Sequence, residues 1–228
     1  MIVATLAANL ARVREDIARV QAAEGLAGPV AIVAVTKGHL PAAAAAAWHA
    51  GLADVGENRV QEAVSKQDAV VVPVRWHLIG HLQTNKARFV PGRFVCVQSV
   101  DSLRVAEALS RAMTKAGGTV RVLIQVNVAG EGQKSGCPPG DAGALVAAAG
   151  RLPGLAVDGL MTIAPFTDDE GVQRRTFAAL RRVRDDLASP ERPLRELSMG
   201  MSGDFRAAVA EGATMLRLGT VLFGERPA

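Results

Sequence analysis

The sequence contains no tyrosine and only two cysteines among its 228 residues. Cys96 and Cys137 lie far apart without CxxC spacing, so we expect neither a disulfide framework nor a zinc site. No apolar run approaches the roughly 20 residues that a membrane-spanning helix needs. Charged residues interrupt the N-terminal segment from Arg12 onward, so no secretory leader is expected. These absences predict a cytoplasmic protein with reduced thiols.

An excess of charge of one sign is also missing. The chain has 26 Lys and Arg against 22 Asp and Glu, a net charge of +4. The basic run around Arg181 is offset by Asp185 and Asp186, as is usual on the solvated face of a helix. Nothing resembles a basic stripe interleaved with aromatic residues, so nucleic acid is not an expected partner. The composition, 49% hydrophobic and 21% charged, is typical of globular proteins.

The most informative stretch is residues 30–37, Val-Ala-Ile-Val-Ala-Val-Thr-Lys. Its uncharged, β-branched run predicts a strand buried on both faces, and Gly38 and Pro41 then introduce a helix over residues 42–47. Lys37 therefore ends a buried strand at a strand-to-helix turn, where parallel α/β folds place their chemistry. A lysine at the end of a strand ordinarily marks the point where the chain reaches solvent, which is one interpretation of Lys37. The alternative is an amine nucleophile that forms a Schiff base with a carbonyl compound.

The same strand-to-helix alternation continues along the chain. An apolar stripe, with members four or three residues apart, predicts a helix that packs on the body of the protein and ends near Gly25: Leu6, Leu10, Val13, Ile17 and Val20. Strands are predicted over residues 30–37, 54–57, 74–80, 94–100, 120–128, 156–163, 196–202 and 215–223. Helices are predicted over residues 42–47, from about 59, and over 82–89, 103–115, 142–151, 168–187 and 204–212.

Eight short strands alternating with helices, without a linker, predict an α/β fold: one (β/α)8 TIM barrel over residues 1–228, with an extra N-terminal helix over 1–25. An open doubly wound sheet is the alternative. In a barrel, all the carboxyl ends of the strands meet at one rim. The residues expected there are Lys37, Asn58, His77, Asn127, Met161, Ser202, Arg217, Gly219 and Thr220. Since this set has no pair of carboxylates, glycosidase chemistry is not favoured.

The last two strands carry a second signal. The segment over residues 199–204, Met-Gly-Met-Ser-Gly-Asp, places a hydroxyl-bearing turn at a helix start, and Gly219 and Thr220 end the last strand. Barrels of this class commonly bind phosphate after strands seven and eight, although a Gly-Thr pair alone is also an ordinary turn. Together with Lys37, this site suggests a ligand with an aldehyde and a phosphate, such as pyridoxal 5′-phosphate (PLP).

Several motifs then resemble the pyridoxal phosphate homeostasis proteins, the YggS or PROSC family, over almost the whole chain. They are residues 34–37 (AVTK), 56–62 (GENRVQE), 76–86 (WHLIGHLQTNK), 134–136 (KSG), 159–161 (GLM), 197–202 (LSMGMS), 217–220 (RLGT) and 223–224 (FG). Three positions depart from the family pattern. Thr36 and Gly38 stand where serine and threonine are expected, and His81 stands where proline is usual.

The resemblance implies a role for each matching residue. Lys37 would bind PLP as a Schiff base, and Ser202, Gly219 and Thr220 would hold its phosphate. Arg217 would face the pyridine nitrogen, with Asn58 and Met201 near the ring. The fold would be similar to the N-terminal barrel of alanine racemase. No catalytic or metal-binding residue is implied.

Arg217 limits what such a site could catalyse. A guanidinium only donates hydrogen bonds, so it favours an unprotonated pyridine nitrogen and a poorer electron sink. Racemisation needs two opposed bases, and in alanine racemases the second is a tyrosine from a partner's C-terminal domain. This chain has no tyrosine and ends soon after the predicted eighth strand, so we expect a solvent-open site.

Three hypotheses follow. The first, which comes from the resemblance, is a non-enzymatic carrier that buffers PLP, is monomeric and has PLP-dependent apo-enzymes as candidate acceptors. The second is a weak PLP-dependent amino-acid racemase. The third is a Schiff-base lyase or aldolase acting on a sugar phosphate, which predicts a colourless protein. His77 is a candidate general base, but a histidine in an apolar strand is ordinarily a core residue.

Overall fold

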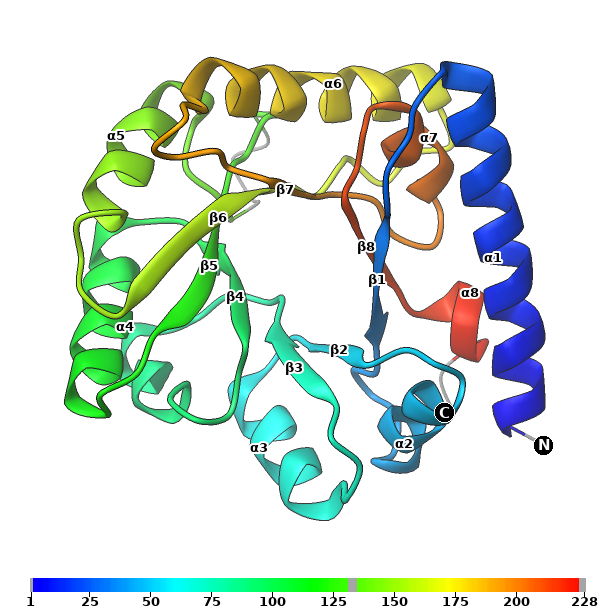
Figure 1. Cartoon of the computed structure of the whole chain (residues 1–228), viewed down its shortest axis with the longest axis horizontal. Coiled ribbons are helices and arrows are strands. Elements are labelled where there is room, and N and C mark those ends of the chain that lie inside the picture. The colour runs from blue at the N-terminus through cyan, green and yellow to red at the C-terminus, as the bar shows by residue number, and fades with distance from the viewer. Residues whose placement is uncertain (1, 131–134, 226–228) are drawn as a thin grey trace.

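The computed structural model describes residues 2–130 and 135–225. Its centre is a closed barrel of eight parallel strands in sequential order, in which β8 pairs with β1 (Figure 1). The predicted (β/α)8 fold is therefore confirmed, and the open doubly wound sheet is not formed. The strands are β1 (Ala31–Val35), β2 (Asp54–Glu57), β3 (Arg75–Leu78), β4 (Cys96–Val100), β5 (Val120–Gln125), β6 (Leu155–Met161), β7 (Glu196–Ser198) and β8 (Met215–Leu218).

Helical segments follow the strands and form the outer layer of the barrel (Figure 1). They are α2 (Ala42–His49), α3 (Val60–Ala69), the 3-10 helix η1 (Thr84–Phe89), α4 (Leu103–Lys115), α5 (Pro139–Ala149), α6 (Glu170–Leu187), α7 (Phe205–Ala210) and α8 (Thr220–Phe223). The helix predicted over residues 82–89 is thus a short 3-10 turn. Pro91 lies just beyond it and has no N–H with which to continue a helix.

The N-terminal helix α1 (Ile2–Glu24) confirms its predicted apolar stripe. Leu6, Leu10, Val13 and Ile17 are buried, and the helix packs beside α2, α7 and α8 (Figure 1). Polar contacts support this packing, since the Asn9 side chain donates to the Leu222 carbonyl over 3.0 Å. In the described part of the chain, no helix has both the length and the apolar character required to cross a membrane.

The eighth strand differs from the prediction. It ends at Leu218, and residues 220–223 form α8 instead of continuing the strand to residue 223. The Gly219 carbonyl accepts from the N–H groups of Leu222 and Phe223, both over 2.9 Å. The pattern Val-Leu-Phe is equally apolar in a strand or a helix, so periodicity over so short a run does not separate the two.

Alternating strand residues face two different environments. Those on the outer face of the sheet, such as Leu197 and Leu216, join the main hydrophobic core beneath the helices. The barrel interior has a small apolar cluster of Cys96, Leu123 and Met161. Met161 was expected at the rim, but its side chain is fully buried in this cluster. Met161, the last residue of β6, therefore packs inside the barrel at its carboxyl end.

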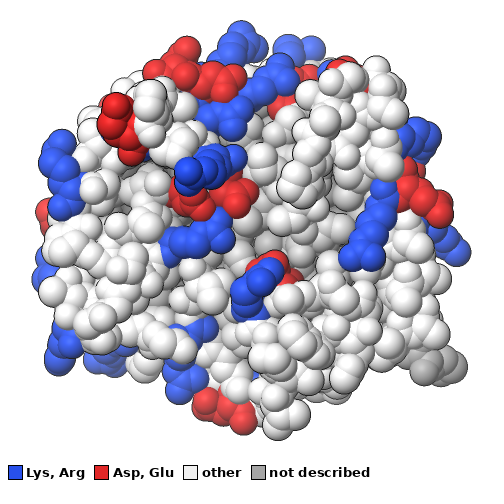
Figure 2. Space-filling model, in the orientation of Figure 1, with Lys and Arg blue, Asp and Glu red and all other residues white. Residues whose placement is uncertain are grey.

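Figure 2 shows basic and acidic side chains interspersed over the face in view, without a continuous stripe of one sign. Several charged side chains of the protein are paired, including Arg121 with Asp158 and Arg174 with Glu24. The distribution agrees with the balanced net charge of the sequence.

Candidate functional site

Lys37 lies in the turn directly after β1 and is partly buried. Because β1 pairs with β8, with Val33 opposite Arg217 and Ala34 opposite Leu218, the carboxyl ends of these two strands are adjacent. A Cβ on Gly219 would lie 3.6 Å from the Cβ of Val35, so the end of β8 contacts the strand that leads to Lys37. The His39 ring, in the loop after β1, and the Phe223 ring, on α8 after β8, have their centroids 5.3 Å apart. The barrel thus brings the first and last loops together.

The loop after β7 turns sharply at Gly200, whose φ of +94° lies in the left-handed region. A Cβ at this position would lie 2.6 Å from the Cβ of Ala208, so the turn has room only for glycine. Beyond it, the Asp204 carboxylate accepts from the Met201 N–H over 2.5 Å. This closed turn places Met201 and Ser202, both partly buried, beside the end of β8.

Ser202 connects the loops after β7 and β8. Its hydroxyl oxygen accepts from the backbone N–H of Gly219 over 3.3 Å and from that of Val221 over 3.2 Å. Thr220, between these two amides, is exposed. The structure therefore brings together all three residues predicted to bind phosphate. The Val221 amide was missed by the sequence analysis, because a backbone donor leaves no residue-type signal.

Arg217 projects from β8 into the barrel and is 4% exposed. Its guanidinium donates to the Ser198 hydroxyl and to the Thr162 carbonyl, both over 2.8 Å. Burial lowers the pKa of Arg217 to about 10, and the Asp204 carboxylate opposes this shift. The guanidinium thus remains protonated at neutral pH and acts only as a hydrogen-bond donor.

Asn58 follows β2 and is partly buried. Gly80, after β3, packs directly on its backbone, since a Cβ on Gly80 would lie 2.3 Å from the Asn58 carbonyl oxygen. The loops after β2 and β3 are therefore in direct backbone contact at these two residues. Asn58 accordingly lies at the carboxyl end of the strand next to β1, as expected.

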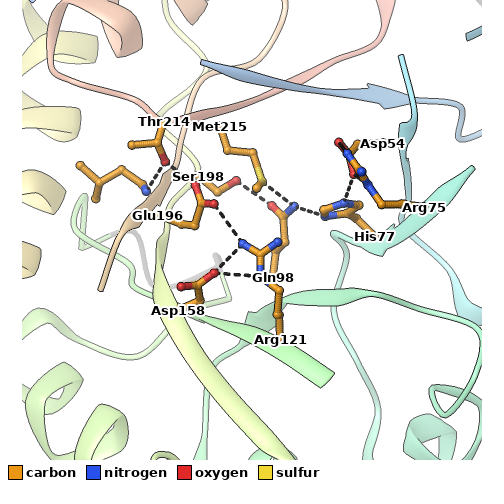
Figure 3. A network of polar contacts seen from close by, with 11 residues as sticks. Asp54, Arg75, His77, Gln98, Arg121, Asp158, Glu196, Ser198, Thr214 and Met215 are labelled. Atoms are coloured by element: carbon orange, nitrogen blue, oxygen red, sulfur yellow. Dashed lines mark hydrogen bonds and ion pairs between the residues drawn. The ribbon is translucent and has the colours of Figure 1, made fainter. Parts of the chain in front are cut away.

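A chain of hydrogen bonds leads from Arg217 through the barrel interior. The Ser198 hydroxyl donates to Gln98 Oε1 over 2.6 Å, and Gln98 Nε2 lies 3.0 Å from His77 Nδ1. His77 Nε2 lies 2.9 Å from Asp54 Oδ1 (Figure 3). The chain thus runs from Arg217 on β8 to Asp54 on β2.

His77 is therefore an interior residue, 1% exposed, and it does not lie at the rim as the sequence analysis expected. It bonds toward Asp54, the first residue of β2, and so toward the amino end of the barrel. Burial disfavours the Asp54 carboxylate, but hydrogen bonds from Arg75 and His77 hold the pKa of Asp54 well below its usual range. The structure gives His77 a structural partner on each ring nitrogen.

A second polar group closes the amino end of the barrel. Arg121 pairs with Asp158 and Glu196, and Glu196 accepts from the Thr214 hydroxyl over 2.6 Å (Figure 3). These residues lie at or near the amino ends of their strands. They are remote from the carboxyl-end loops that carry Lys37 and Ser202.

Other residues singled out in the sequence make structural contacts. His81, at the position where proline is usual, is exposed and lies 3.3 Å from the Asp101 carboxylate. Asn127 is partly buried, and its backbone N–H donates to the Cys137 carbonyl over 2.9 Å. Lys134 of the KSG motif lies outside the described residues. No cluster of three or more metal-ligating side chains occurs among the described residues.

The residues present fit a ligand such as PLP. Lys37 supplies an amine, while Ser202 with the amides of Gly219 and Val221 supplies hydrogen-bond donors suited to an anion. Arg217, which projects from the neighbouring strand β8, supplies a guanidinium donor that is held by two acceptors, the Ser198 hydroxyl and the Thr162 carbonyl. This donor set matches an aldehyde, a phosphate and an unprotonated ring nitrogen.

Comparison with known proteins defines the class. The sequence model of the alanine racemase N-terminal domain matches residues 8–227. The structure of an alanine racemase from Clostridium difficile has a TM-score of 0.78 at 15% identity, covering 98% of this chain and 57% of that chain. This likeness concerns the fold alone. The chain is thus an α/β barrel of the alanine racemase N-terminal type.

Closer relatives define the family. The pyridoxal phosphate homeostasis protein of Pseudomonas aeruginosa is 44% identical over 227 residues, which are 97% of this chain and 96% of that protein. The structure of PipY from Synechococcus elongatus with PLP bound has a TM-score of 0.83 at 38% identity, covering 96% of this chain and all of that one. The chain belongs to the pyridoxal phosphate homeostasis protein family.

Proposed function

We propose that this protein binds PLP as a Schiff base on Lys37 and acts as a carrier that buffers the cofactor in the cell. The observation that carries the proposal is the convergence of three loops. The end of β1, which leads to Lys37, contacts Gly219, and the Gly219 amide donates to the Ser202 hydroxyl. Family membership and the PLP-bound structure of PipY support the same ligand.

The proposed contacts follow the donor set of the site. Ser202, Thr220 and the amides of Gly219 and Val221 bind the phosphate, and Arg217 donates to the pyridine nitrogen. Asn58 and Met201 would lie near the ring. When bound, PLP supplies a reactive aldehyde, and the residues of this chain orient it toward the Lys37 amine.

We further propose that the protein is a carrier and not a racemase. Arg217 is buried, and Ser198 and Thr162 hold its guanidinium in place. A guanidinium in the position proposed to face the pyridine nitrogen donates a hydrogen bond to it, whereas carbanion chemistry relies on an acidic partner that keeps this nitrogen protonated. The sequence also has no tyrosine to act as the second base. We propose a cytoplasmic monomer that passes PLP to apo-enzymes.

The first test is the visible spectrum of the purified protein with added PLP. We expect a yellow absorption band that borohydride removes, with the pyridoxyl group on Lys37 in the digested protein by mass spectrometry. Assays with L-alanine and D-alanine should show no saturable turnover. A colourless protein that stays unlabelled would refute the proposed ligand, while turnover lost in Lys37→Ala would favour the racemase.

The phosphate contact can be tested separately. Ser202→Ala should weaken PLP binding by about 10- to 100-fold, because a hydrogen bond to a charged group contributes roughly 1.5–3 kcal/mol. Its affinity for pyridoxal, which has the aldehyde but no phosphate, should stay within about twofold of the wild type. Spectroscopic titration with both ligands makes the comparison. An equal loss of affinity for both would show that Ser202 does not act on the phosphate.

A further inference from the structure

A buried ion-pair cluster lies beside the Lys37 turn and has no place in the proposed ligand contacts. Lys66, on α3, is 5% exposed, and Glu57, the last residue of β2, is fully buried. Lys66 Nζ lies 2.7 Å from Glu57 Oε1 and 2.8 Å from Glu62 Oε1. Its third donor bonds the Thr36 carbonyl over 2.6 Å. All three donors of the ammonium group are therefore used.

The cluster bonds the backbone on both sides of Lys37. The Thr36 carbonyl, in the peptide unit before Lys37, accepts from Lys66. The Gly38 N–H, in the peptide unit after Lys37, donates to Glu62 Oε1 over 2.7 Å. Since the two peptide planes that flank a Cα define its φ and ψ, the cluster restrains the backbone of Lys37 directly.

Thr36 adds a side-chain contact to the same cluster. Its hydroxyl donates to Glu57 Oε1 over 2.5 Å, and its side chain is fully buried. The Thr36 N–H donates to the Gly56 carbonyl over 3.1 Å, so the ladder between β1 and β2 reaches the residue before Lys37. The bond from the Thr36 hydroxyl to Glu57 therefore helps to fix the point at which the Lys37 turn begins.

The composition of the cluster argues for a role beyond stability. Burial raises the pKa of Glu57, although hydrogen bonds from Lys66 and Thr36 oppose this shift. Its second oxygen, Oε2, is buried without a hydrogen-bond partner among the described residues. Buried ion pairs often stabilise a fold no better than apolar residues of similar volume. Apolar side chains, however, could not bond the two peptide units beside Lys37.

We propose that Lys66, together with Glu57, Glu62 and Thr36, is the positioning unit that aims Lys37 at the ligand aldehyde. This inference deepens the proposed function and rests on it. The unit acts through the backbone of Lys37 and touches no ligand itself. It should therefore control how fast Lys37 reacts and leave the non-covalent affinity of the pocket unchanged.

The test separates covalent from non-covalent binding. One measurement is the rate at which PLP, followed by borohydride, labels Lys37. The other is the affinity for pyridoxine 5′-phosphate, which has an alcohol in place of the aldehyde and cannot form a Schiff base. Lys66→Met should label at least about tenfold more slowly, with its pyridoxine 5′-phosphate affinity within about twofold of the wild type. Lys115→Met, at an exposed lysine on α4, is the matched control and should behave as the wild type.

A second pair of variants tests the proposal even if Lys66→Met does not fold. Thr36→Val removes the hydroxyl that bonds Glu57, whereas Thr36→Ser keeps it. We expect slow labelling in Thr36→Val and labelling at the wild-type rate in Thr36→Ser. Unchanged labelling in Thr36→Val, or equal losses in labelling and in pyridoxine 5′-phosphate affinity, would overturn the proposal. Failure of the wild type to label at Lys37 would instead refute the proposed function.

Discussion

Lys37→Ala should remain colourless when PLP is added and should carry no pyridoxyl group after borohydride reduction. Lys37 supplies the amine for the Schiff base, so its loss leaves only the phosphate and ring contacts. We expect the affinity for PLP to fall about 100-fold, equivalent to roughly 2.7 kcal/mol. Absorption titration gives the affinity, and mass spectrometry of the reduced protein locates any label.

The nearest alternative lysine strengthens this prediction. Lys66 bonds the Thr36 carbonyl beside Lys37, but it is buried and all its donors are bonded. It should not take over the reaction. Lys115→Ala, at an exposed lysine, serves as the control and should keep the full band. Labelling of Lys37→Ala at a different lysine, to the wild-type extent, would contradict the assignment.

Gly200→Ala should strongly destabilise the protein. The new Cβ would lie 2.6 Å from Ala208 Cβ and 2.9 Å from Leu216 Cδ2, at a residue whose φ is +94°. Overpacking and left-handed strain together should cost about 3 kcal/mol or more. For a chain of this length we expect the melting temperature to fall by roughly 10 °C. PLP affinity should also fall, since the turn places Ser202.

The same loop offers a matched control. Gly203 is exposed, has no positive φ, and an added Cβ would meet nothing within 4 Å. Gly203→Ala should therefore change the free energy of unfolding by no more than about 0.5 kcal/mol. Thermal melting of both variants, monitored by circular dichroism, makes the comparison. Equal melting temperatures would mean that the turn tolerates a side chain at Gly200.

Local sequence patterns, repeated along the chain, made the barrel predictable. The α1 stripe appears in the sequence because four-and-three spacing keeps its apolar residues on one helix face, and those residues are buried. Asp169 was predicted near the start of the helix over residues 168–187, and it accepts from the Val172 N–H at the start of α6. Such features depend on neighbours within a few residues, so they survive without knowledge of the fold.

The predictions that failed concern interior placement. Met161 and His77 were assigned to the rim by their positions in predicted strands, yet both lie inside the barrel. Met161 ends β6 and His77 precedes the last residue of β3, so both do lie at or next to strand ends. Position along a strand does not tell whether a side chain points into the packed interior of the barrel or toward its mouth.

The sequence by itself determined the sequential (β/α)8 barrel and placed Lys37 and Gly219 at the ends of strands, because hydrophobic periodicity and glycine position are local. Only the tertiary structure decided that Lys66 bonds the backbone around Lys37, and that Ser198, Gln98 and His77 connect Arg217 to Asp54. These contacts join residues from different strands and helices. Their geometry depends on the register of the closed sheet, which no local pattern encodes.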